Sequence, residues 1–236
     1  MIVSLTILRY RRLFIPFALL AMAIHRIPLI MNRTCSFWKL LGCGKNGGFG
    51  LQPDWRQWGL LAVWDSQQAF IDFNERSFVS WWWNLFAAER WTTLCVPIAS
   101  HGKWDGKEHF KIVQDNKYVK GPVAVLTRAS IRFDKLKDFW SNVEPVTQII
   151  ARAPGYITSF GIGEAPFFRQ ATFSIWNNLE SMKEFAYNSA EHLDVIRKTR
   201  QEDWYSEELF ARFALISASG TLNGTDPLLG ILTDQV

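Results

Sequence analysis

Residues 161–213 read GIGEAPFFRQATFSIWNNLESMKEFAYNSAEHLDVIRKTRQEDWYSEELFARF. After an opening turn, the apolar-rich run Arg169–Trp176 predicts a strand, and Asn177–Arg200 has the pattern of a helix. A second strand is predicted at Glu207–Ile216. The stretch therefore predicts a strand, helix, strand unit whose only histidine, His192, lies on the helix.

The same order of elements occurs twice along the chain. GLLAVWDSQQAFIDF (59–73) matches ATFSIWNNLESMKEF (171–185), and IASHGKWDG (98–106) matches SASGTLNG (217–224). Each half then has the order β-α-β-β-α-β of a ferredoxin-like unit. The predicted strands are 2–10, 36–44, 58–65, 89–100, 123–132, 156–163, 169–176 and 207–216, and the predicted helices are 13–31, 66–86, 135–153 and 177–200. Ser66 is expected to be the N-cap of its helix.

The last predicted strand indicates how the two halves pack. Leu209, Ala211 and Phe213 point one way and Phe210 and Ala214 the other, so both faces are mostly apolar and both need cover. Helices cover only one face of such a sheet, so the other must meet a second sheet. We therefore predict an α+β fold in which two ferredoxin-like (βαββαβ) repeats form a dimeric α/β-barrel type of fold. The pattern leaves open whether the barrel closes within one chain or across a dimer.

The expected organisation is a first repeat at 1–104, a linker at 105–121 and a second repeat at 122–236. The polar, glycine-bearing linker places His101 and His109 on the surface by default. The glycine-rich segments GCGKNGGFG and GIGEAP are followed by strands, so we interpret them as turns and not as phosphate-binding loops.

Composition narrows the class of protein. The chain has 236 residues, 48% of them hydrophobic and 20% charged, which is typical of a soluble protein with a real core. The net charge of +4 suits an acidic or membrane-surface partner and is too small to indicate nucleic acid. Three cysteines without CxxC spacing argue against a disulfide framework or zinc site and favour a reducing compartment. We therefore expect a cytoplasmic protein.

The N-terminus requires a choice between a membrane segment and a core helix. The uncharged apolar run, Leu13–Ala23, is too short to span a bilayer as a helix, and it contains Pro16. An apolar, strand-like run, Ile2–Leu8, precedes it where a signal peptide would be basic. We predict a strand followed by a buried helix, with a cleaved signal peptide as the less favoured alternative.

Tryptophan and phenylalanine are unusually frequent, at 12 and 18 residues. This surplus is compatible with a flat ligand, a membrane contact or a bulky core. Trp81, Trp82 and Trp83 are consecutive, so they cannot all face inward on one helix. An exposed member would mark a dimer contact, an entrance for a lipophilic substrate or a peripheral membrane contact, and a crowded helix interface is the alternative.

His192 is the most informative titratable residue. At helical spacing it shares a face with Phe185 and Ile196, and on this pattern alone a core histidine is favoured. The functional alternative is axial ligation of haem iron by a neutral imidazole.

Arginines form a second group of candidates. Arg128, Arg169 and Arg212 fall in predicted strands, and Arg197 and Arg200 follow His192. Arginine forks bind carboxylates such as haem propionates, and the alternative is a structural pair with Glu207 or Glu208. The sequence contains no recognisable Ser/His/Asp or Cys/His triad pattern, so the catalytic residues stay unknown.

Several separated segments resemble the spheroidene monooxygenase family of acyclic carotenoid 2-ketolases. They occur in order from about Phe37 to Leu228, and the resemblance covers nearly the whole chain. These segments are FWKLLGCG, WGLLAVW, VPIASHGKWDG, GPVAVLTRASIR, GIGEAPFFRQATFSIW and the EELFARF segment that follows Trp204.

The resemblance implies a haem-dependent monooxygenase that uses O2 to oxidise a terminal-region methylene of an acyclic carotenoid to hydroxyl and ketone. It implies haem b, an electron donor protein such as a ferredoxin, and a homo-oligomer. The chain also resembles the dimeric α/β-barrel haem proteins. This second resemblance implies that the second repeat bears the haem and that His192 is the iron ligand.

The expected cofactor contacts are Arg197, Arg200, Arg212 and Phe185. The expected pocket lies between the second-half helix and its sheet, lined by Phe173, Ile175 and Phe185. Two other readings stay open: a different haem chemistry on the same scaffold, such as dehydration or peroxidation, and a non-enzymatic haem-binding module.

Overall fold

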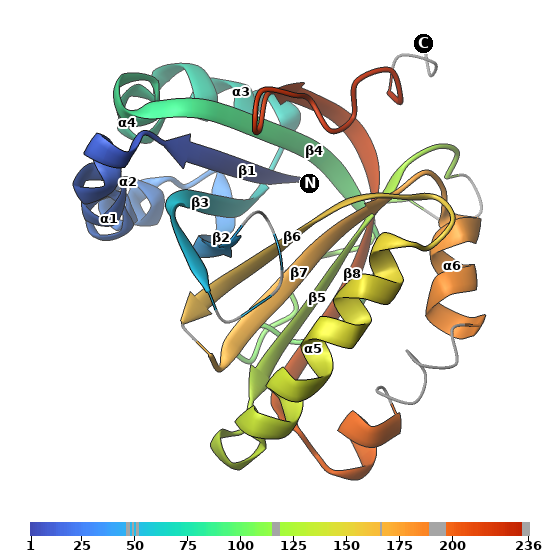
Figure 1. Ribbon diagram of the computed structural model, residues 1–236. Helices are drawn as coiled ribbons and strands as arrows, with labels where there is room; N and C mark the ends of the chain where they lie inside the picture. The colour runs from blue at the N-terminus through green and yellow to red at the C-terminus, as the bar shows by residue number, and fades with distance from the viewer. Residues whose placement is uncertain are drawn as a thin grey trace.

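Strand pairing closes the chain into a single barrel in the computed structural model, which describes residues 1–45, 48, 50, 52–114, 119–165, 167–188 and 197–232. Within these residues, antiparallel strands pair in the order β1-β3-β2-β6-β7-β5-β8-β4, and β4 pairs with β1 to complete the circle. The helices of the first half and those of the second half lie on different sides of the barrel (Figure 1).

Among its described residues, the first half contains four strands, two pairs of α-helices and a 3-10 turn. Its elements are β1 (Ile2–Tyr10), the 3-10 turn η1 (Arg12–Phe14), α1 (Ile15–Ile24), α2 (Arg26–Met31), β2 (Cys35–Gly44), β3 (Pro53–Trp64), α3 (Gln67–Arg76), α4 (Phe78–Phe86) and β4 (Ala87–Gly102). The strand order in this half is β4-β1-β3-β2.

The second half repeats this plan with the strand order β8-β5-β7-β6. Its elements are β5 (Val123–Ile131), η4 (Phe133–Lys135), α5 (Leu136–Ala151), β6 (Tyr156–Ala165), β7 (Arg169–Trp176), α6 (Leu179–Asn188) and β8 (Tyr205–Gly220). The two sheets join through the long β4–β8 pairing and the short β2–β6 pairing, so the barrel closes within one chain. The predicted α+β fold of two ferredoxin-like repeats is confirmed.

One predicted helix is divided in two. Ser66 is the N-cap expected, because its side chain accepts a hydrogen bond from Ala69 N at 3.1 Å. The helix predicted for 66–86 breaks at Ser77, which has extended backbone angles. Its side chain accepts from Ser80 N at 3.0 Å and so starts α4. The pattern missed this break because serine is unremarkable within a helix until its backbone leaves the helical region.

Alternation along the strands fills the barrel interior. On β8, Leu209, Ala211 and Phe213 share one face, as predicted, and this face points into the barrel and is almost fully buried. On the opposite face, Ala214 and Phe210 pack in a separate cluster outside the barrel. The interior is therefore a packed core.

The two repeats cap each other at equivalent turns. After β4, the backbone N–H groups of Asp105 and Gly106 donate to the Glu207 carboxylate at 3.2 and 2.7 Å. After β8, the N–H groups of Asn223 and Gly224 donate to the Glu89 carboxylate at 2.6 and 2.9 Å. These turns lie in the two segments whose sequences match, so the internal repeat extends to the hydrogen bonds.

Part of the segment 105–121, which the sequence predicts to be an exposed linker, packs into the barrel core. Phe110 is buried inside the barrel together with Trp104, which immediately precedes the linker. His109 stacks on Phe37 with ring centroids 3.7 Å apart and is half-buried, whereas His101 is exposed as expected. Polar composition suggested exposure, but the aromatic neighbours bring this segment against the barrel.

The N-terminal helices depart from the sequence prediction. The helical stretch Arg12–Met31 continues through His25 and Pro28 and reaches 20 residues, about 30 Å at the usual rise. By length and composition alone it is long enough to cross a membrane. The expectation of a buried helix is wrong, because only 22% of its apolar window is buried.

We predict that Gly102 and Gly220 are each required for barrel closure. Both have positive φ, 87° and 89°, and a Cβ on either would overlap a carbonyl oxygen of the paired strand, that of Glu208 or Arg90. Gly102→Ala or Gly220→Ala should lower the free energy of unfolding by about 2 kcal/mol or more, measured by chemical denaturation. Gly50→Ala, which meets open space, is the control. Equal stability of all three variants would contradict the prediction.

Candidate functional site

The outer face of the second-half sheet is the first candidate. Under α6, the side chains of Val125, Trp176 and Met182 form an apolar cluster on this face. Phe185 packs against Trp176 with ring centroids 5.2 Å apart. The face is therefore an apolar layer packed between α6 and the sheet.

Arg212 is the charged group on this face. Its Nη2 donates to the Tyr187 hydroxyl at 2.9 Å, and its guanidinium carbon lies 5.1 Å from the centre of the Phe210 ring. Its Nε is buried and has no hydrogen-bond partner within the part of the chain that the structure describes. A buried donor without a partner is costly, so this position fits an anionic ligand group such as a carboxylate.

The structure separates several residues that the sequence grouped together. Phe173 and Ile175 lie inside the barrel, so the prediction that they line a pocket with Phe185 is wrong. Strand alternation explains the error, since residues 173 and 175 share the inward face of β7. His192 lies outside the described residues.

The other predicted arginines differ in their burial. Arg197 and Arg200 are exposed side chains in the helical segment that precedes β8. Arg128 faces the opposite way, into the barrel. Only Arg212 and Phe185 of the expected cofactor contacts are therefore seen together on the outer face.

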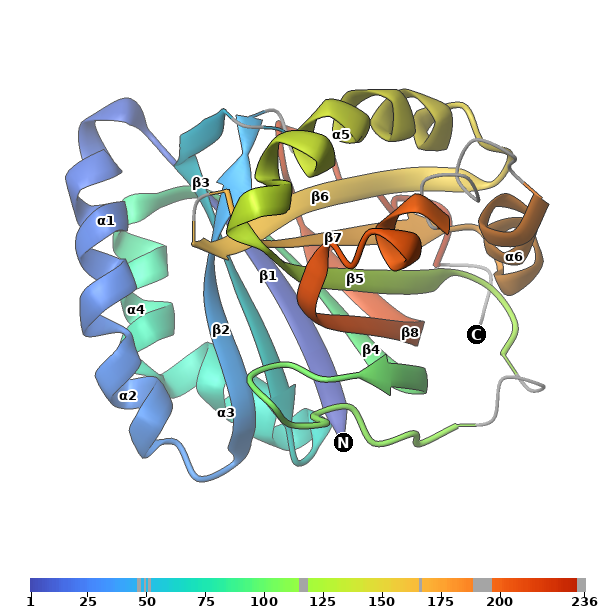
Figure 2. The ribbon, with the colours of Figure 1, turned by 90° about the horizontal axis from the view of Figure 1, so that it is seen from below.

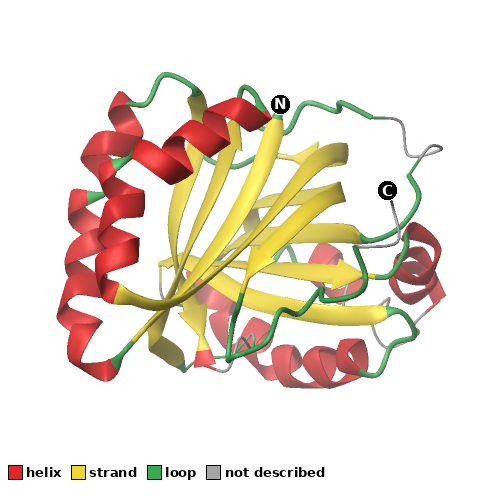
Figure 3. Cartoon of the chain, turned by 90° about the horizontal axis from the view of Figure 1, so that it is seen from above, coloured by secondary structure: helices red, strands yellow, loops and turns green. Residues whose placement is uncertain are grey.

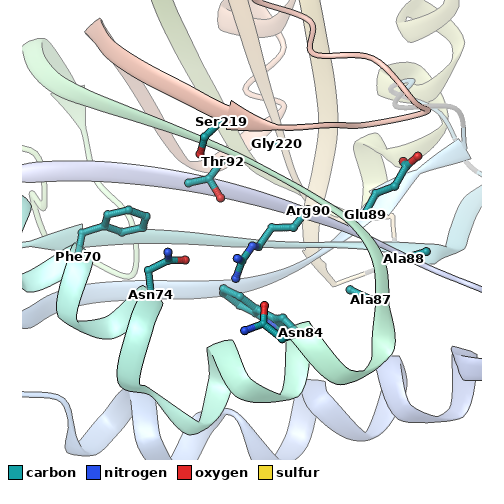
Figure 4. A pocket seen from close by; sticks show the side chains of 11 residues that line it. Phe70, Asn74, Asn84, Ala87, Ala88, Glu89, Arg90, Thr92, Ser219 and Gly220 are labelled. Atoms are coloured by element: carbon teal, nitrogen blue, oxygen red, sulfur yellow. The ribbon is translucent and has the colours of Figure 1, made fainter.

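A second candidate is a cavity of about 500 Å³ in the first half. It lies between α3, α4 and β4 (Figure 4). The internal repeat makes this position equivalent to the α6–β8 face of the second half. Its lining residues are Phe70, Asn74, Trp83, Asn84, Ala87, Ala88, Glu89, Arg90, Thr92, Ser219 and Gly220.

Arg90 gives this cavity its chemical character. Its Nη1 donates to Ser80 Oγ at 3.2 Å, and burial lowers its pKa. Glu89 points away from it in Figure 4 and caps the turn after β8. Among the described residues no carboxylate pairs with Arg90, so the cavity is suited to a small anion or an oxygen-bearing group. No sequence motif pointed to it, because its residues come from separate elements.

A network of charged residues closes one end of the barrel. Arg128 on β5 is 1% exposed and pairs with Glu207 and, at 3.4 Å, with Glu164. Lys39 pairs with Glu164 at 2.6 Å, and Trp104 Nε1 donates a hydrogen bond to the Glu164 carboxylate at 2.8 Å. Burial alone would raise the pKa of Glu207, but hydrogen bonds from the Gly106 N–H and the Arg128 guanidinium lower it. The structural pairing considered for Arg128 is confirmed.

His25 is a buried histidine without a charged partner. Its ring lies edge-on to Trp82 at 5.8 Å and to Trp83 and Phe78 at 6.2 Å, and its Nε2 has no hydrogen-bond partner in the described structure. Burial lowers its pKa to about 4. It is therefore a neutral packing group at physiological pH.

Two other classes of site find no support in the described residues. They contain no group of three or more His, Cys, Asp or Glu side chains that could hold a metal ion. Cys35, Cys43 and Cys95 are buried and free, and burial raises their thiol pKa values. Such thiols are poor nucleophiles.

Breaking the charged network should destabilise the barrel strongly. Arg128→Met leaves Glu164 and Glu207 without their buried partner, and we expect a loss of about 3–5 kcal/mol of unfolding free energy. Arg132→Met removes an exposed pair with Asp203 and should cost less than about 1 kcal/mol. Chemical denaturation of both variants tests this, and similar losses would argue against the network.

The pKa of His25 predicts a pH-dependent stability. Between about pH 6.5 and pH 4 the unfolded chain binds a proton at His25 and the folded chain does not, so stability falls as pH falls. Protonation of His25 should lower the free energy of unfolding by about 3 kcal/mol once the pH is below both pKa values. Unfolding free energies measured from pH 7 to pH 4 should show a shallower slope for His25→Leu than for the wild-type protein. An unchanged slope in His25→Leu would refute this role.

Comparisons with known proteins cover most of the chain. A family model described as "Domain of unknown function (DUF3291)" matches residues 123–216, from β5 into β8. The spheroidene monooxygenase of Cereibacter sphaeroides is 37% identical over 213 residues, which are 90% of this chain and 64% of that protein. The chain thus spans less than two thirds of that relative's length.

A second relative is matched over most of its length. The spheroidene monooxygenase of Rhodobacter capsulatus is 35% identical over 215 residues, covering 91% of this chain and 89% of that protein. Among solved structures, an aldoxime dehydratase in complex with butyraldoxime has a TM-score of 0.60 at 10% identity, covering 98% of this chain and 84% of that one. At this identity the likeness concerns the fold alone.

Proposed function

The chain belongs to the spheroidene monooxygenase family, and from this premise we propose that it is a monooxygenase acting on an acyclic carotenoid. The observation that carries the proposal is the 35% identity that extends over 89% of the Rhodobacter capsulatus relative. The first hydroxylation gives an alcohol at a methylene near the end of the polyene, and a second at the same carbon gives a geminal diol that loses water to form the ketone. Each hydroxylation uses one O2, two electrons and two protons, and releases one water.

The cofactor that we propose is haem b on the outer face of the second half. Two features of this face support the assignment: the apolar wall of Met182, Phe185 and Trp176, and the buried Arg212 Nε that lacks a partner. Bound haem supplies O2 activation, with electrons from an external donor such as a ferredoxin. Arg212 would bind a propionate, and the exposed Arg197 and Arg200 are further candidates for this role.

The residues of this chain have distinct tasks in the proposal. Met182 and Phe185 exclude water from the ring and from an apolar polyene beside it. Tyr187 holds the Arg212 guanidinium through its hydroxyl, which orients the charged end of the cofactor. His192 is the iron ligand that the family resemblance implies, and it stays a prediction.

The absorption spectrum of the purified protein tests the cofactor. After expression with an adequate haem supply we expect a Soret band, its loss or shift in His192→Ala, and about tenfold weaker haem retention in Arg212→Leu, because a charge-assisted hydrogen bond is lost. Arg169→Leu, at an exposed position on β7, which β5 separates from β8, is the control. Absence of a Soret band in the wild-type protein would exclude haem.

Product analysis tests the reaction separately. We expect a ketocarotenoid from an acyclic carotenoid with O2 and a reducing system, and one atom of ¹⁸O from ¹⁸O2 in the first hydroxylated product. Turnover with peroxide alone would indicate peroxidase chemistry. Tight haem binding without any turnover would indicate a binding module.

A further inference from the structure

Three helices of the first half share an outward surface of apolar side chains. α1, α2 and α4 lie side by side on the outside of the barrel (Figures 2 and 3). We name this surface the helical face. Its exposed residues, with Leu13 of the adjoining η1, are Phe17, Leu19, Leu20, Ile27, Ile30, Met31, Phe78, Trp81 and Leu85.

Ring contacts make the helical face one continuous surface. Phe17 of α1 stacks on Phe86 of α4 with centroids 4.3 Å apart. Phe78 of α4 meets the ring of His25 at 6.2 Å and that of Trp81 at 5.7 Å. Aromatic contacts therefore join α1 to α4 within the helical face itself, and its exposed side chains remain uncovered.

The amount of apolar exposure is unusual for a protein surface. Arg12–Met31 has a mean hydropathy of 2.0, yet 22% of its apolar window is buried. Ile27, Ile30 and Met31 are 64%, 72% and 74% exposed. A helix that is apolar on all sides requires an apolar neighbour on all sides, so the helical face indicates a contact with an apolar partner.

The fold argues against the helix crossing a bilayer. β1, immediately before it, pairs along its length with both β3 and β4, and β2, immediately after it, pairs with β3. Both ends of the helical stretch are therefore held in the barrel. A transmembrane arrangement would require β1 or β2 to leave the sheet, whereas a contact parallel to a surface requires no change.

Charge around the helical face distinguishes between partners. In the printed sequence no Asp or Glu precedes Asp54, whereas Arg11, Arg12, Arg26 and Arg33 border the apolar side chains and are exposed. A second copy of the same surface would bring these arginines together without acidic partners on the three helices. An anionic surface with an apolar interior complements both features.

We propose that the helical face binds the interface of an anionic lipid bilayer, with α1 and α2 parallel to the membrane plane. The apolar side chains enter the boundary of the acyl chains and the four arginines contact the lipid phosphates. The inference deepens the proposed function, because a long apolar carotenoid dissolves in the bilayer. Only this biological purpose of membrane binding rests on the proposed function; the binding itself is inferred from the surface.

Vesicle binding tests the proposal without requiring turnover. The full chain should co-sediment with vesicles of mixed phosphatidylcholine and phosphatidylglycerol, bind vesicles of phosphatidylcholine alone at least tenfold less well, and lose affinity as salt is raised. Leu20→Glu/Ile27→Glu/Trp81→Glu should lower the affinity for anionic vesicles at least tenfold. The matched control is Phe133→Glu on η4, where the side chain is 76% exposed.

A second variant separates charge from insertion. Arg11→Gln/Arg12→Gln/Arg26→Gln should weaken binding to anionic vesicles and flatten its salt dependence, while leaving the circular dichroism spectrum unchanged. Binding by the triple glutamate variant equal to that of the wild type would overturn the proposal, as would absence of wild-type binding. A dimer that Trp81→Glu converts to a monomer, without lipid binding, would overturn it in favour of a second copy.

The outcome is distinguishable from failure of the proposed function. Vesicle binding without turnover of any carotenoid would support the membrane contact and refute the enzymatic assignment. Turnover of detergent-dispersed carotenoid at the wild-type rate by the triple glutamate variant, with vesicle binding lost, would support both. Turnover by a protein that binds no vesicles would refute the membrane contact alone.

Discussion

Closure of two four-stranded sheets on each other is the constraint on which the rest of the structure depends. Each sheet has an apolar face that helices do not cover, and the long β4–β8 pairing with the short β2–β6 pairing turns these two faces toward one axis. The interior is then filled by side chains such as Phe173 and Phe213, so it serves stability. Ligand contacts are consequently expected on the outer faces, between sheet and helices.

The near-symmetry of the repeats makes their differences informative. Glu89 and Glu207 perform the same capping task at equivalent turns, but Glu207 also pairs with the buried Arg128. On the outer faces the divergence is greater. The second half presents Arg212 beside an apolar wall, whereas the first half presents a polar cavity around Arg90 and, on its helices, an aromatic and aliphatic shell.

These outer faces suggest a division of labour between the repeats. The family relationship makes the protein a candidate carotenoid oxygenase, and a substrate of that kind is insoluble in water. In this arrangement the first half would contact lipid and the second half would hold the redox cofactor. The protein would then oxidise a polyene dissolved in the membrane without enclosing it in a large pocket. The buried, neutral His25 beneath the helical face is consistent with an inner layer that excludes water.

The sequence by itself determined the order of elements, the duplication and the sheet-to-sheet packing, because apolar alternation and matching segments are local or periodic signals. It also identified the family through segments spread from Phe37 to Leu228. Only the tertiary structure decided that the barrel closes within one chain, that Phe173 and Phe185 lie on opposite sides of a strand layer, and that Trp104 and Phe110 belong to the core. It also decided that the N-terminal helix, which looks like a core helix, is exposed: hydropathy records what a side chain prefers, whereas exposure depends on which elements happen to pack against it.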